Sequence, residues 1–252
     1  MDNQILLERI RRIGRIRHFS NCYNRKAIMN AGRIWESDES FMFSYEDHGV
    51  QRIAFFVTDY DALDRLLDGL PDGDYYLEMM TKNPDEYSPQ CMDSVARMMR
   101  MSNPDCRAAV ANSLLQEFTD ESIVDVASSE DVIEINRLLW SVFRPEVSHL
   151  LSDEELLEIV QKHQVFIHRG ERIDAVLQAE IMPKKFYINQ IINKSDKSVI
   201  HSILCRALKP YVESGGRYVY AWVEESNIAS VRFHKKYGMK HDGMWSVVYR
   251  KT

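Results

Sequence analysis

The sequence predicts an α/β protein with a mixed sheet, arranged as two halves in tandem. The stretch Tyr218–Met239 gives the main signal, because it reads as a buried strand, a polar turn at Asn227 and a helix closed by Gly238. Strands and helices alternate in the same manner through the rest of the second half. Part of this pattern recurs in the first half, where a hairpin around Asp47-His48-Gly49 and a helix precede the strand Tyr75–Met80.

The first segment has helical periodicity from Gln4 to Arg17, with isoleucines and leucines on one side and a cluster of arginines on the other. Such a helix can meet a membrane or RNA, but a solvated basic face on a packed helix is the interpretation that we favour. A second helix is expected from Lys26 to Arg33, followed by a charged connector over Glu36–Glu39.

The next segments predict a hairpin, a helix and a strand. Phe41–Tyr45 and Arg52–Val57 flank a turn signal and read as paired strands. Leucines at helical spacing predict a helix over Asp61–Leu70, which precedes the strand Tyr75–Met80. The run Ala96–Met101 fits either a strand or a helix end.

The second half reads as a complete cycle of elements. Ser152-Asp-Glu-Glu155 is a capping box that opens a helix, and Pro210 is expected to kink or end another helix near its last turn. The expected elements are, in order, a strand near Ser122–Val126, a helix over Val132–Val142, a helix from Ser152 to Val160, a hairpin of Val165–His168 with Ala175–Ile181, a strand over Phe186–Asn193, a helix from Lys197, the strand Tyr218–Val223, a helix after Asn227, and a strand over Trp245–Tyr249.

The spacing from Asn227 through Ser230 and His234 to Gly238 and Met239 resembles the last motif of the GNAT superfamily of acyl-CoA N-acyltransferases. In that motif an Asn opens the helix, and a small residue, an aromatic residue and a Gly-Phe pair follow. Here His234 stands at the aromatic position and Met239 at the Phe position.

The order of elements from Ser122 to Thr252 also resembles that of GNAT folds. The resemblance implies a GNAT-like fold with an acetyl-CoA-binding domain over residues 122–252. It further implies a linker helix over 108–121 and a degenerate GNAT-like repeat over 1–107.

GNAT folds hold acetyl-CoA where two parallel strands separate, with the pyrophosphate at the N-terminus of the next helix, which is an anion site by its unpaired N–H groups. The glycine-rich signature of the family would fall on Ser195, Ser198 and Ile200, so neither of its glycines is present. A solvated helix cap is therefore an equal alternative to a phosphate site. The resemblance implies these cofactor-binding residues: Ile191, Ile192, Asn193, Lys197, Ser198, Val199, Asn227, Ser230 and His234.

Acyl transfer to an amine needs a base for the amine proton and an acid for the departing thiolate. The resemblance implies that His234 is the acid, with Tyr237 as a second candidate, although a helix histidine without a catalytic role also fits. Glu180 is the candidate base, and Glu224 and Glu225 are alternatives. Water can also relay the proton.

The composition narrows the class of protein. A net charge of −6 over 252 residues argues against a nucleic-acid partner, and no run approaches the ~18 apolar residues of a membrane span. The first residues interleave charges in a way that predicts no secretory signal, so we expect a cytoplasmic protein. The cysteines lack C-x-x-C spacing and suggest neither a metal site nor a disulfide framework; they are Cys22, Cys91, Cys106 and Cys205.

These observations predict an acetyl-CoA-dependent N-acetyltransferase, with no metal, that transfers an acetyl group directly to a small-molecule or peptide amine. The alternative is a catalytically silent GNAT-like module that binds a ligand or a partner. The missing glycines favour the module, whereas the Asn227–Gly238 unit favours the enzyme.

Overall fold

The computed structural model describes residues 7–8, 10–11, 19–22, 25–37, 39–111 and 120–252. Most of the helix expected over Gln4–Arg17 and most of the linker helix expected over 108–121 lie outside these residues. The chain forms two compact units. Unit 1 comprises residues 1–98, 145–149 and 243–252, and unit 2 comprises residues 99–144 and 150–242.

Unit 1 is a sheet in the order β2-β3-β4-β5-β12, with β1 paired to β4. The predicted hairpin is confirmed, because β3 and β4 join at His48 and Gly49, whose φ angles of 51° and 81° suit a tight two-residue turn. Leucines of α3 pack on one face of this sheet. The elements are β1 (Phe19–Ser20), α2 (Arg25–Met29), β2 (Ala31–Ser37), β3 (Ser40–Asp47), β4 (Val50–Val57), α3 (Tyr60–Asp68) and β5 (Tyr75–Thr81).

Two expectations for this region need correction or completion. The helix expected to Arg33 ends at Met29, and β2 replaces its last turn and the expected connector. The reason is tertiary: Ile34 and Trp35 pair with Phe43 and Met42 of β3, a contact that local periodicity does not reveal. The undecided run Ala96–Met101 is a strand, part of β6 (Asp93–Asn103).

The connection between α6 and α7 belongs to unit 1 through a cluster of charged groups. The Arg52 guanidinium, 2% exposed, donates to Asp47 at 2.9 Å and to the carbonyl oxygens of Pro145 and Glu146. His149 bridges two carboxylates, with Nδ1 3.1 Å from Asp47 and Nε2 2.8 Å from Glu78. These contacts fix the connection onto β4 and β5.

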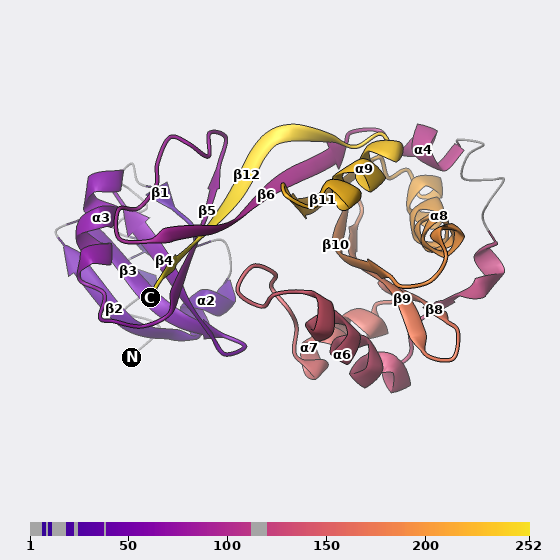
Figure 1. Ribbon diagram of the computed structural model, residues 1–252, viewed down its shortest axis with the longest axis horizontal. Coiled ribbons are helices and arrows are strands. Elements are labelled where there is room, and N and C mark those ends of the chain that lie inside the picture. Colours follow the sequence, from indigo (N-terminus) through magenta and orange to yellow (C-terminus); the bar gives the residue numbers. More distant parts are fainter. Residues whose placement is uncertain (1–6, 9, 12–18, 23–24, 38, 112–119) are drawn as a thin grey trace. The chain divides into compact units, whose positions relative to one another are not determined.

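Unit 2 contains a sheet in the order β6-β11-β10-β9-β8-β7. One hydrophobic core joins its strands to α8 and α9, and a second core joins the opposite face to α6 and α7 (Figure 1). The elements are α4 (Arg107–Ala111), β7 (Val124–Val126), α6 (Val132–Val142), α7 (Asp153–Gln161), β8 (Val165–Arg169), β9 (Ile173–Met182), β10 (Lys185–Asn193), α8 (Lys197–Glu213), β11 (Tyr218–Glu224), α9 (Ile228–Lys236) and β12 (Lys240–Lys251).

Pro210 does not end α8, which continues to Glu213. Proline removes only one backbone donor, and the last turn is held by other contacts. The Tyr211 side chain is buried and its hydroxyl donates to the Tyr218 carbonyl at 3.0 Å, while Ser214 N–H bonds the Pro210 carbonyl at 3.0 Å.

Each sheet is completed by the last strand of the other half of the sequence. In unit 1, β12 pairs with β5 from Trp245↔Thr81 to Lys251↔Tyr75. In unit 2, β6 is the neighbour of β11. The two compact units therefore differ from the division predicted at residues 107 and 122, because β6 and β12 each belong partly to both.

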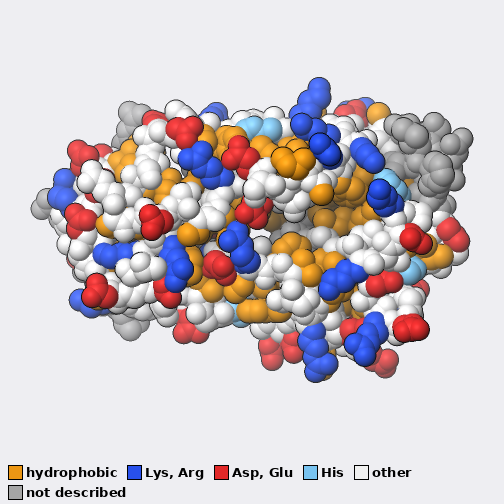
Figure 2. Space-filling view, viewed as in Figure 1, with side chains coloured by type: hydrophobic (Ala, Val, Ile, Leu, Met, Phe, Trp, Pro, Cys, Tyr) orange, Lys and Arg blue, Asp and Glu red, His pale blue; other side chains and the backbone are white. Residues whose placement is uncertain are grey.

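The apolar character of the helices and the charges of the surface are relevant to a membrane or nucleic-acid partner. None of the described helices has the length and apolar character that crossing a bilayer requires. On the face shown in Figure 2, acidic and basic side chains are interspersed.

Candidate functional site

The parallel strands β10 and β11 pair only over part of their length. Pairing runs from Lys185↔Tyr218 to Ile188↔Ala221, after which β10 continues to Asn193 and β11 to Glu224. The other edge of β10 stays paired with β9, with a bulge between Ile188 and Gln190. Beyond Ile188, the edge of β10 that faces β11 can therefore hydrogen-bond an extended ligand, as an added strand would.

The N-terminus of α8 follows this strand directly. Asn193 organises the connection, because its Oδ1 accepts from Ser195 N–H at 3.2 Å and its Nδ2 donates to the Asp196 carbonyl at 3.0 Å. Asp196 is the N-cap residue, but its side chain makes no capping bond. Lys197 and Ser198 are exposed in the first turn, where helix N–H groups and the helix dipole favour an anion.

The remaining cofactor candidates on these elements differ in position. Ile191 is half-buried against the core under α8, but Ile192 is buried in the core under α6 and α7. Val199 is also buried, and its N–H bonds the Asp196 carbonyl at 3.0 Å. The bulge in β10 sets which isoleucine faces which layer, and period-two patterning does not reveal it.

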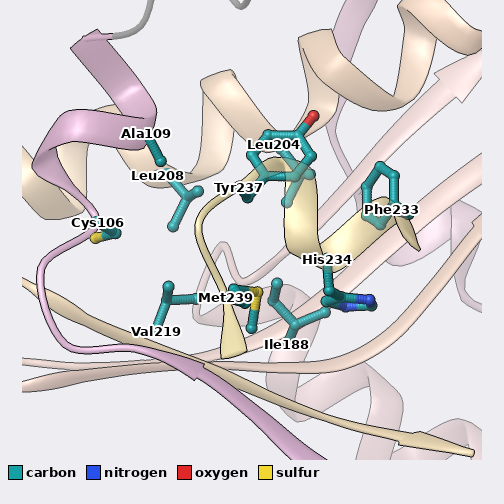
Figure 3. Close-up of a pocket in the computed structure, with 10 residues that line it drawn as sticks. All are labelled: Cys106, Ala109, Ile188, Leu204, Leu208, Val219, Phe233, His234, Tyr237 and Met239. Carbon is teal, nitrogen blue, oxygen red and sulfur yellow. The ribbon is translucent and has the colours of Figure 1, made fainter. Parts of the chain in front are cut away.

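A small apolar pocket lies where α8 and α9 cover β10 and β11 (Figure 3). His234 of α9 and Tyr237, the residue that follows this helix, both contribute to its lining. The Tyr237 hydroxyl bonds His201 of α8, and in Figure 3 it points away from Ile188 and Met239. The lining residues are Cys106, Ala109, Ile188, Leu204, Leu208, Val219, Phe233, His234, Tyr237 and Met239.

His234 is almost fully buried, with 2% of its surface exposed. Burial lowers its pKa, so the imidazole is neutral at pH 7. Its Nδ1 donates to the Ser230 carbonyl at 2.8 Å, and Nε2 has no hydrogen-bond partner among the described residues. A neutral ring with its lone pair on Nε2 suits a proton acceptor, whereas the sequence prediction gave His234 the role of proton donor.

Asn227 and Ser230 have a structural role in the motif. The Asn227 Oδ1 accepts from Ser230 N–H at 3.0 Å and caps α9. At the other end of the helix, Gly238 takes a φ of 72°, and the Asn103 side chain donates to the Tyr237 carbonyl beside it. Caps thus account for the polar residue and the glycine that define the motif.

The candidate bases lie away from His234. Glu180 is exposed on β9, on the sheet face opposite α8 and α9, because its neighbour Ala179 faces their core. Glu224 is 3.1 Å from Arg144 in an ion pair, and Glu225 is exposed in the turn before α9. Thus Glu180 and His234 occupy opposite faces of the sheet.

Unit 1 contains an equivalent opening that the chain itself fills. The parallel strands β4 and β5 pair only at Arg52↔Tyr76 and Ile53↔Leu77. Beyond this point the Asn21 side chain bridges them: its Oδ1 accepts from Phe55 N–H at 2.8 Å, and its Nδ2 donates at 2.9 Å to the carbonyls of both Ile53 and Glu78. The sequence does not predict this role, because nothing local to Asn21 signals partners that lie 32 and 57 residues away.

Comparison with known proteins shows that the fold is GNAT-like. No known protein family and no curated protein sequence matches the chain. Solved structures do match. A GCN5-related N-acetyltransferase from Sphaerobacter thermophilus aligns with a TM-score of 0.54 and 11% identity over 84% of this chain and 76% of the other.

Two further structures agree with this result. An acetyltransferase of the GNAT family from Colwellia psychrerythraea gives a TM-score of 0.53 and 9% identity over 86% of this chain and 84% of the other. A GCN5-related N-acetyltransferase from Kribbella flavida gives 0.52 and 12% over 99% of this chain and 70% of the other. At these identities the likeness establishes the GNAT-like fold alone.

Proposed function

We propose that the chain is an acetyl-CoA-dependent N-acetyltransferase that binds its cofactor in unit 2, where β10 and β11 separate. The observation that carries this proposal is the edge of β10 beyond Ile188, which leads directly into the N-terminus of α8. A strand edge and a helix N-terminus in succession supply hydrogen bonds for the pantetheine amides and an anion site for the pyrophosphate.

Individual residues take the following parts in this proposal. The backbone of Ile191, Ile192 and Asn193 pairs with pantetheine, while Lys197 and Ser198 add a charge and a hydroxyl at the pyrophosphate. Asp196 opposes phosphate binding by its charge, so the site is weaker than a glycine-rich loop would be. The opening in unit 1 takes no cofactor, because the Asn21 amide already holds its backbone groups.

The reaction is a direct transfer to an amine, which is a small molecule or a peptide. An ammonium group first loses a proton, and Glu180 or water takes it. The free amine attacks the thioester carbonyl carbon, the C–N bond forms and the C–S bond breaks. The nitrogen then releases its second proton to water, and water returns a proton to the thiolate, because neutral His234 cannot supply one from Nε2.

A catalytically silent binding module is the second candidate function. Two observations favour it, namely the Asp196 carboxylate beside the expected phosphate position and the neutral, buried state of His234.

Calorimetric titration with acetyl-CoA, and separately with CoA, tests the proposal. We expect micromolar binding at one site per chain. Ser198→Glu should abolish it by placing a negative charge in the first turn of α8. Ser129→Glu, also exposed in unit 2 but on a different turn, should leave it unchanged. No binding at millimolar cofactor would refute the acetyltransferase proposal and leave the binding module as the candidate function.

A further inference from the structure

One face of the unit 2 sheet carries a row of side chains that the proposed cofactor site does not use. The row crosses three strands in register, since Glu180 of β9 lies opposite Tyr187 of β10, and Tyr187 lies opposite Tyr220 of β11. Phe186 and Ala221 point into the core under α8 and α9. The row therefore lies on the opposite face.

The tyrosine rings form a continuous aromatic surface beside the carboxylate. The Tyr187 and Tyr220 rings stack with centroids 4.7 Å apart and planes 9° from parallel, and Tyr218 stacks on Tyr220 at 5.6 Å. Burial, together with the negative charge of Glu180, raises the pKa of Tyr220. The negative charge of Glu180 therefore reaches the Tyr220 ring, and the carboxylate and the ring faces both attract a cation.

A second observation on the same face points to a ligand. Gln178 lies two residues before Glu180, and it is paired directly with Gln190 of β10. These glutamines are 0% and 4% exposed. Among the described residues, neither amide atom of Gln178 has a hydrogen-bond partner, and neither does Oε1 of Gln190. Unsatisfied buried amides destabilise a fold by about 1–3 kcal/mol per group, so these amides need a partner from outside the chain, which is a water molecule or a ligand.

The charged groups around the row balance one another, and most of them are paired. Arg100 lies over the Trp222 ring at 5.9 Å and is 2.8 Å from Asp242. Arg144 is paired with Glu224. Lys185 of β10 is exposed on the same face, opposite Tyr218, so three cations against these two carboxylates and Glu180 give a net charge of 3 − 3 = 0.

We propose that this face binds the acceptor as an organic ammonium ion that also carries a hydroxyl or amide group. The ammonium group lies at Glu180 and the tyrosine rings, and the polar substituent hydrogen-bonds to the amides of Gln178 and Gln190. This inference rests on the proposed transferase function, for which it supplies the class of acceptor. A compound without a positive charge, or one with a negative charge, does not fit beside the Glu180 carboxylate.

Saturation-transfer NMR with two matched pairs of compounds tests the inference. Glucosamine and tyramine each carry an ammonium group and hydroxyls, whereas glucose and 4-ethylphenol lack the ammonium. We expect at least one of the two amines to bind and neither neutral compound to do so. Glu180→Gln should weaken the binding at least tenfold, while Glu171→Gln, an exposed carboxylate in the β8–β9 turn, should leave it unchanged.

The outcomes separate the two proposals. If CoA binds in calorimetry but neither amine gives a signal, or if Glu180→Gln binds the amine as the native protein does, the acceptor inference is overturned. If an amine binds and CoA does not, the ammonium site stands and the transferase proposal fails.

Gln178→Leu tests the second contact with a readout that does not depend on catalysis. A leucine of similar volume removes the unsatisfied amide, so the urea midpoint should rise while amine affinity falls about fivefold. A higher midpoint with unchanged amine affinity would overturn the assignment of the polar substituent to the glutamines.

Discussion

Replacing Asn21 by alanine is expected to destabilise unit 1 by about 3 kcal/mol. The amide makes three hydrogen bonds of 2.8 to 2.9 Å, to Phe55 N–H and to the carbonyls of Ile53 and Glu78. A net contribution of about 1 kcal/mol for each bond gives this total, and leaving the strand groups unpaired adds to it. The loss falls where β4 and β5 are no longer paired to each other, so neither strand can replace the missing bonds.

Urea denaturation and amide hydrogen exchange measure this effect. The exchange of the Phe55 amide should accelerate about 100-fold if local opening follows the loss in stability. Asn21→Asp should destabilise at least as much, because it keeps the acceptor for Phe55 N–H but loses both donors. Asn83→Ala, in an exposed loop of unit 1, is the control. A change below 0.5 kcal/mol with unaltered Phe55 exchange would refute the reasoning that the amide holds the two strands together.

Three further predictions concern pH and packing. The two carboxylate partners of His149 outweigh its partial burial and raise its pKa to about 9, so its stabilising effect is full below about pH 6.5 and is lost as the pH rises through 9. His149→Gln should flatten the urea midpoint over that range, and an unchanged alkaline fall would contradict this. Gly216→Ala should cost about 1–3 kcal/mol in thermal unfolding, because the added Cβ would lie 2.3 Å from the Tyr211 ring; a melting temperature equal to that of the native protein would show that the ring moves freely. If the neutral form of His234 takes part in turnover, the rate should stay flat above pH 7 and fall only below about pH 6.5, because burial lowers the pKa of His234. A decline of the rate above pH 7 that His234→Ala removes would contradict a role for the neutral imidazole.

Local signals were sufficient for many elements of the fold. The β3–β4 hairpin follows from a turn at His48 and Gly49 between alternating strands, and α7 follows from the capping box at Ser152. Both signals act over a few residues, so a single sequence contains them. Strand β2 was missed because its burial depends on pairing with β3, and the Met-rich run in β6 has no β-branched residues to favour a strand.

The candidate site was predictable only where it depends on sequence order. The strand β10 and the start of α8 were placed correctly, since both carry a clear pattern. The burial of His234 and the bridging of β4 and β5 by the Asn21 side chain could not be predicted, because each depends on packing between segments far apart in the sequence. The bulge after Ile188, which turns Ile191 and Ile192 toward different layers, has no glycine to mark it.

The two places where parallel strands separate, between β4 and β5 and between β10 and β11, differ in what their backbone groups bond. Each half of the sequence supplies a pair of parallel strands that separate after a few residues, β4 with β5 and β10 with β11. In unit 1, the backbone groups beyond the separation bond a side-chain amide from the same chain, so an external amide would have to displace Asn21. In unit 2, the corresponding edge of β10 runs into a helix N-terminus. The same geometry that recognises an amide group thus stabilises unit 1, and this difference is the reason that the proposed function assigns the cofactor to unit 2 only.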